Sequence, residues 1–223
     1  MRSAAVGTAL GLALAVGVPT GWQLTRESTA AGTPVEQVLP APGTPVPPSM
    51  PSAAAPASSL LPVTTRDAAP TVAPVQPAPV ALAVPALDVA APVDPVGVRD
   101  DGQMAIPDDV DRVGWYRFGP APGSGGSAVL AGHVDDREQG LGELAALREA
   151  EVGTEVLVTD ATGGTTRWRV VSREQVDKRA LPVDRLFARE GPPRLVLVTC
   201  GGEFVPEHGG YESNVVVVAE PWP

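Results

Sequence analysis

The chain has 223 residues and a formal net charge of −10 at pH 7, and from residue 96 onward 21 acidic side chains face 13 basic ones. Because binding to a phosphate backbone needs a basic surface, this charge argues against nucleic acid as a partner. With one cysteine and two histidines, the chain can form no intrachain disulfide and offers too few ligands for a usual zinc site, so we expect no metal and no cofactor.

The N-terminal segment, residues 1–31, contains an uncharged apolar run. Residues 4–24 are 21 residues without a charge, preceded by Arg2 and followed by Arg26 and Glu27. A membrane-spanning helix needs about 20 predominantly apolar residues, so the run is long enough. A signal-anchor and a cleaved signal peptide both fit, and we favour the anchor because no small-residue cleavage site directly follows the run. Arg2 then predicts a cytoplasmic N-terminus, one span of the cell membrane and an extracellular C-terminal domain, or a secreted domain after cleavage.

Residues 32–95 have the composition of a spacer. They include sixteen prolines among alanine, valine, serine and threonine, and no aromatic residue. Proline lacks the amide donor and fixes φ, which disfavours the interior of helices and sheets. The composition predicts a disordered Pro/Ala-rich spacer that the domain does not need for folding.

Residues 96–223 are the expected folded domain. Short apolar runs divided by glycine, proline and aspartate predict an all-β barrel or sandwich rather than alternating strands and helices. Residues 142–149 and 182–187 are the two short helices that we expect. The strands that we expect are 103–106, 112–116, 127–133, 155–159, 166–172, 194–200 and 214–219.

Two chemically competent side chains lie at the ends of predicted strands. Cys200 ends the run that starts at Arg194, and Gly201 and Gly202 follow it; His133 ends the run that starts at Ser127. A thiol and an imidazole are the minimum for a nucleophile activated by a neighbouring acid/base. Glycines beside the thiol let a substrate backbone approach closely. A buried, inert cysteine is the alternative interpretation.

The order of the motifs resembles that of the class F sortases of actinobacteria. The resemblance covers about residues 106–219, and it depends on Gly114-Trp115-Tyr116, on Pro122-Gly123, on the segment from Gly126 through His133 to Asp135, on Leu197-Val198-Thr199-Cys200-Gly201-Gly202, and on Tyr211 with Asn214.

This resemblance implies a sortase-like eight-stranded β-barrel behind an N-terminal membrane anchor, with an extracellular active site. It implies a cysteine transpeptidase that cleaves a Leu-Pro-x-Thr-Gly-like sorting signal of surface proteins. Cys200 would form the thioacyl intermediate, and His133 would be the general acid/base. The acyl group would pass to an amine of a cell-wall precursor. Thr199 would line the site, and Asp135 would orient the imidazole or be a solvated loop residue.

One part of the family's site is missing. The resemblance implies an arginine near the last strand that stabilises the oxyanion, but residues 201–223 contain no arginine or lysine, and Glu212 stands at that position. A carboxylate cannot donate a hydrogen bond to an oxyanion. Candidate replacements are His208, which could equally be a solvated loop residue, and the arginines Arg117, Arg137 and Arg194.

Two other functions remain open. A sortase barrel that keeps a peptide groove but is catalytically impaired would be a peptide-binding protein, and Glu212 is the reason to consider it. An L,D-transpeptidase also uses histidine and cysteine on an exported β-rich domain, but Val198 and Thr199 before Cys200 differ from the Ser-His-Gly-Cys type of segment in that family.

Overall fold

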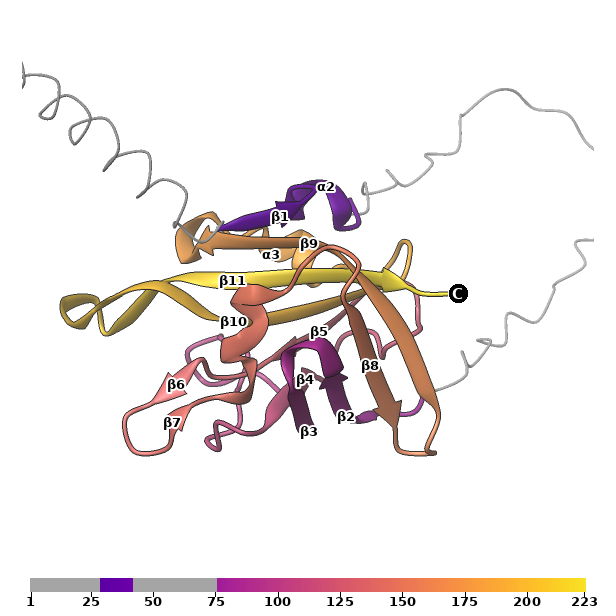
Figure 1. Cartoon of the computed structure of the whole chain (residues 1–223), viewed down its shortest axis with the longest axis horizontal. Coiled ribbons are helices and arrows are strands. Elements are labelled where there is room, and N and C mark those ends of the chain that lie inside the picture. The colour runs from indigo at the N-terminus through magenta and orange to yellow at the C-terminus, as the bar shows by residue number, and fades with distance from the viewer. Residues whose placement is uncertain (1–28, 42–75) are drawn as a thin grey trace, which may run out of the picture.

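The computed structural model describes residues 29–41 and 76–223 (Figure 1). Strands dominate, and every helix or 3₁₀ turn is short. In chain order the elements are β1 (Ala30–Gly32), α2 (Val35–Val38), β2 (Pro79–Val84), η1 (Pro85–Leu87), β3 (Val89–Val96), β4 (Val113–Tyr116), β5 (Ser127–Ala131), β6 (Asp135–Asp136), β7 (Gly140–Leu141), η2 (Glu143–Glu149), β8 (Glu155–Asp160), β9 (Thr165–Asp177), η3 (Lys178–Ala180), α3 (Val183–Leu186), β10 (Arg194–Val205), η4 (Pro206–His208) and β11 (Gly210–Pro221).

Eight strands close into a barrel. The order around the sheet is β9, β11, β10, β5, β4, β3, β2 and β8, and β8 pairs back with β9 to close the ring. β3 and β4 run parallel, as do β5 and β10, and the other pairs are antiparallel. The predicted all-β fold, an eight-stranded barrel with short helices, is confirmed. The apolar segment expected before it lies outside the described residues.

The strands beneath the site are apolar on both faces. Leu197 and Val217 pack in the barrel interior, whereas Val196 and Val216, one residue away on each strand, pack in a second cluster on its outer face. Successive side chains of a strand point to opposite faces, so a strand whose successive residues are all buried must be covered on both sides. The predicted strand at residues 214–219 is part of β11, and residues of α2 and α3 supply part of its outer cover.

The predicted spacer is wrong where residues 79–95 are concerned, because β2 and β3 are strands of the barrel. Residues up to Pro92 of β3 pair with β2, and residues from Val93 pair with β4. Each half of β3 therefore leaves one side unpaired, and proline is tolerated where its missing amide has no ladder partner. The folded domain consequently begins near Pro79, not at residue 96.

Residues 29–41 are also ordered against the barrel, and we call them the N-terminal strap. β1 adds to β9 beyond the part that pairs with β8, so the strap lies along the β9 side in Figure 1. Val35 and Leu39 are buried, at 1% and 4% exposure. The remaining spacer, residues 42–75, and most of the predicted segment 1–31 lie outside the described residues.

Polar contacts hold the α2 turn of the strap against the barrel. The Val35 amide donates to the Glu174 carboxylate at 2.9 Å. The Arg185 guanidinium, on α3, donates to the Glu36 carbonyl at 2.8 Å, and Arg194 donates to the Val38 carbonyl at 2.9 Å. The strap therefore connects β9, α3 and β10 on the outside of the barrel.

Leu39→Ala should lower the free energy of unfolding by about 2–5 kcal/mol, because it leaves a cavity in the outer cluster. Gln37→Ala, at an exposed position of the same turn, should change it by about 0.5 kcal/mol or less. Urea unfolding of the full chain measures both. Equal effects of the two substitutions would contradict the docking of the strap.

One further prediction, the strand at residues 103–106, differs from the structure. Residues 103–106 form no strand, since only Met104 makes an isolated bridge, to Val98. The local β propensity of these residues therefore did not predict their pairing in the fold. Among the described residues, no helix is long and apolar enough to cross a membrane. The apolar run at residues 4–24 is not among them.

Candidate active site

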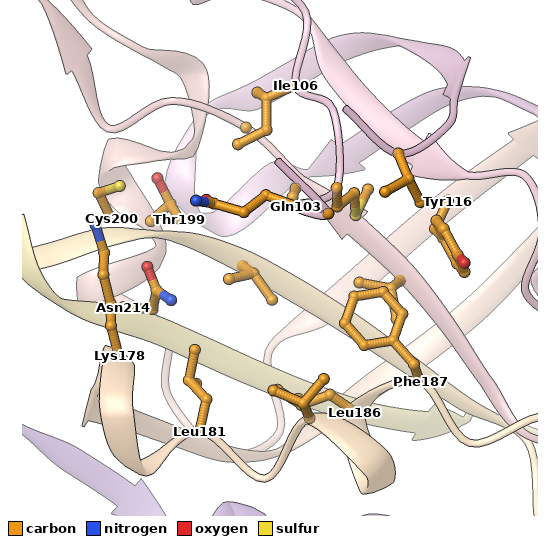
Figure 2. A pocket seen from close by; sticks show the side chains of 18 of the residues that line it. Gln103, Ile106, Tyr116, Lys178, Leu181, Leu186, Phe187, Thr199, Cys200 and Asn214 are labelled. Atoms are coloured by element: carbon orange, nitrogen blue, oxygen red, sulfur yellow. The ribbon is translucent and has the colours of Figure 1, made fainter. Parts of the chain in front are cut away.

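A cavity of about 800 Å³ opens where β10, β5 and β11 meet (Figure 2). Cys200, Thr199 and Asn214 line one end of it. Apolar side chains form most of the remaining wall. They come from the segment before β4, from the end of β4 and from the connection between β9 and β10, and they include Met104, Ile106, Tyr116, Leu181, Leu186 and Phe187. The cavity therefore combines a nucleophile at one end with an apolar trough.

Cys200 lies where β10 changes register. It pairs with Asn214 of β11, and the register shifts after Gly201. Gly202 has φ +78°, a conformation that residues with a side chain rarely adopt, and a Cβ on Gly201 would lie 2.8 Å from the Val215 side chain. The two glycines thus permit the bend directly after the free, partly buried thiol.

Thr199 carries an unsatisfied hydroxyl at the cavity. The residue is 3% exposed, and its Oγ1 is buried without a hydrogen-bond partner among the described residues. Buried polar atoms in native proteins nearly always have a partner. Thr199 is among the residues that line the cavity, while its hydroxyl oxygen itself is buried.

The topology brings His133 to the level of Cys200. β5 and β10 pair in parallel, with Ala131 opposite Val198, and the Gly132 amide donates to the Val198 carbonyl at 3.1 Å. His133 follows the last paired residue of β5 by two positions, as Cys200 does on β10, and His133 is not among the described residues that line the cavity. The imidazole charge also contributes to lowering the pKa of Asp136, after the larger effect of hydrogen bonds from backbone amides.

Asp135 accepts a hydrogen bond from the Tyr211 hydroxyl at 2.6 Å. This contact joins the β6–β7 hairpin to the start of β11, where Tyr211 also packs edge-on against Phe204 at 5.2 Å between ring centroids. The hydrogen bond raises the pKa of Tyr211 to about 12, with a smaller contribution from the negative charge of Cys200. Asp135 thus positions Tyr211 near the thiol. The sequence analysis assigned no role to Tyr211.

Tyr211→Phe should remove the highest alkaline step of the phenolate absorbance. A raised pKa of about 12 means that the hydrogen bond stabilises the fold fully below the ordinary value of 10.0 and is lost as the pH rises through 12. The stability difference between the parent and Tyr211→Phe should therefore vanish between these pH values. Tyr116→Phe is the control and should keep the step.

None of the arginines that we considered replaces the oxyanion-stabilising arginine of the family pattern at the cavity. Among the described residues, no arginine lines the cavity. Arg117 lies over the Phe118 ring at 4.8 Å, and Arg194 donates to the carbonyls of Val38 and Pro193. Arg137 lies in the β6–β7 hairpin, so none of the three predicted replacements is in the cavity lining.

Glu212 is likewise outside the cavity lining that the structure describes. Glu212 contributes to raising the pKa of Arg179, after the larger effect of Asp177. His208 ends η4, and its side chain is not among the described groups. The lining does contain a cation that the sequence reasoning missed, Lys178 of η3. No motif marks this residue, and only the fold reveals its position.

No group of three or more histidine, cysteine, aspartate or glutamate side chains in residues 29–41 and 76–223 is arranged to hold a metal ion.

Comparison with known proteins gives one family. The family model described as the sortase domain matches residues 82–222. No curated protein sequence matches. Solved structures include sortase C1 from Streptococcus suis, at 17% identity and a TM-score of 0.50, covering 66% of this chain and 74% of that one. Sortase A from Listeria monocytogenes is 19% identical, with a TM-score of 0.49 and coverage of 66% and 88%. With most of its described residues matched by the family model, the chain belongs to the sortase family.

Proposed function

We propose that the protein is a cell-surface transpeptidase of the class F sortase type. It cleaves a Leu-Pro-x-Thr-Gly-like sorting signal and transfers the acyl group to an amine of a cell-wall precursor. The observation that supports this most is the parallel pairing of β5 with β10, because His133 follows the last paired residue of β5 by two positions and Cys200 follows the last paired residue of β10 by two. The family provides the reaction class, and this geometry provides the two groups that the reaction needs.

The steps follow from the groups present. The Cys200 sulfur adds to the peptide carbonyl carbon and the electron pair moves to the oxygen. The C–N bond then breaks, His133 gives a proton to the leaving amine, and a thioester remains on Cys200. An incoming amine attacks the thioester carbon and loses a proton to His133, and the C–S bond then breaks to give the amide and return the Cys200 thiolate.

The apolar trough supports the proposed signal. Its wall contains Met104, Ile106, Leu181 and Phe187, which suit leucine and proline side chains better than charged ones. An extended peptide whose scissile carbonyl lies at Cys200 would place its preceding apolar residues along this wall.

We further propose that residues 4–24 anchor the protein in the cell membrane, with the barrel outside the cell. The length of the uncharged run and Arg2 before it support this arrangement. An extracellular barrel is where a protein that modifies surface proteins has access to both of its substrates.

Incubation of the full chain with a sorting-signal peptide tests the function. Mass spectrometry should detect an adduct on Cys200 equal to the acyl part of the peptide, and a glycine-based amine should remove it. A peptide with the leucine and proline exchanged for aspartates is the control and should give no adduct. Saturable peptide binding without any adduct would favour the second candidate, a peptide-binding protein, which is suggested by the absence of arginine from the described lining.

A further inference from the structure

The cavity around Cys200 has a distinctive charge inventory. Among the described residues that line it, Lys178 is the one cation and Asp184, on α3, is the one carboxylate. Lys178 is also the single lysine of the whole chain. No ion pair forms between Lys178 and Asp184. The charge that a reacting peptide would meet at this cavity is thus set by very few groups.

Lys178 is brought to the cavity by the pairing of β9 with β11. Asp177, the last residue of β9, pairs with Ser213, and Lys178 follows it directly in η3. Asn214, next to Ser213, pairs in turn with Cys200. Figure 2 shows the Lys178 side chain running from η3 toward the end of the cavity that Cys200 and Asn214 line.

Arg179, the cation next to Lys178 in the chain, interacts with carboxylates of its own. Arg179 pairs with Asp177, at 3.3 Å between Nε and Oδ1, and the charge of Glu212 also acts on it. The carboxylates of Asp177 and Glu212 therefore interact with Arg179. In the described part of the chain, Lys178 has no carboxylate within 4.0 Å.

We propose that the Lys178 ammonium is the positive charge of the Cys200 site. This role rests on the proposed function, in which addition of the sulfur to a carbonyl places a negative charge on the carbonyl oxygen. An ammonium at the cavity stabilises that charge without giving up a proton. Lys178 is exposed in the empty cavity, so water screens its charge until a peptide covers it.

Alkylation of the full chain tests the charge without any peptide. Iodoacetate and iodoacetamide react with the same thiol and differ in one negative charge, so the ratio of their rates reports the local potential. At low ionic strength, Lys178→Met should lower the iodoacetate-to-iodoacetamide ratio by about threefold or more, since a nearby unit charge is then weakly screened. Arg179→Met is the matched control and should leave it within error. An unchanged ratio in Lys178→Met overturns the proposal, whatever the peptides do.

Acylation by the sorting-signal peptide tests the oxyanion role. Lys178→Met should slow formation of the thioacyl adduct about tenfold or more, Lys178→Arg should retain most of the rate, and Arg179→Met should match the parent. An unchanged rate in Lys178→Met overturns this role, and a loss with Gln103→Ala instead would assign it to that amide, whose side chain also lines the cavity. If the parent forms no adduct, the proposed function fails while the alkylation ratio still decides whether Lys178 supplies the charge.

Discussion

Cys200→Ala should abolish formation of the acyl adduct and all amine transfer. The thiol is the single nucleophile of its kind in the chain, and it lies at the cavity beside an unsatisfied hydroxyl. Loss of an enzyme's nucleophile typically costs about 10⁶ in kcat. Because Cys200 is only partly buried, the substitution should leave the fold intact. Mass spectrometry and a peptide-release assay measure the loss.

Two controls separate loss of chemistry from loss of binding. Cys200→Ala should bind the sorting-signal peptide as the parent does, in a fluorescence titration. His133→Ala should keep an alkylatable thiol but lose turnover, because it removes the proton donor for the leaving amine. Release of peptide by Cys200→Ala at the parent rate would remove the thiol from the mechanism.

A chain that begins at Val96 should fail to fold cooperatively. It lacks β2 and nearly all of β3, so β4 and β8 each lose one of their two partner strands and the ring opens between them. The missing part also supplies the buried side chains of Leu82, Val84 and Val89 to the core. Loss of three such side chains removes about 5–9 kcal/mol of burial, which is comparable to the stability of a whole domain.

A chain that begins at Gln76 is the matched comparison. It keeps all eight barrel strands and lacks only the strap among the described elements. Urea unfolding followed by tryptophan fluorescence should give one cooperative transition for this chain and none for the shorter one. A shorter chain that unfolded at the same urea concentration would show that β2 and β3 are dispensable.

The sequence predicted the strands that carry the chemistry because their signals are local. Apolar runs ending in His133 and in Cys200 are visible without a fold, and the barrel then brings them together as parallel neighbours. The sequence analysis did not predict β2 and β3. The buried residues of β3 alternate with exposed ones, as at Val89, Ala91 and Val93, but the many prolines of this segment obscured that alternation. Whether a proline fits a strand depends on which side of it has a partner, and this is a tertiary property.

Lys178 shows the same limit at the site. Its neighbours in sequence, Asp177 and Arg179, form a charged surface pair, and only the register of β9 against β11 places Lys178 near Cys200. The arginine expected from the family pattern was sought near the last strand. A functional charge can come from any element that reaches the cavity, and sequence position does not reveal which one does.

Docking of the N-terminal strap changes how far the barrel can travel. A free stalk of residues 32–95 would let it range about 200 Å from its attachment, at about 3.1 Å per residue. With residues 4–24 in the membrane as proposed, only four residues separate the span from Thr29, where the strap begins. Even fully extended, they reach no more than about 15 Å. With that anchor, the proposed transpeptidase would meet its substrates at the membrane surface and not deep in the cell wall.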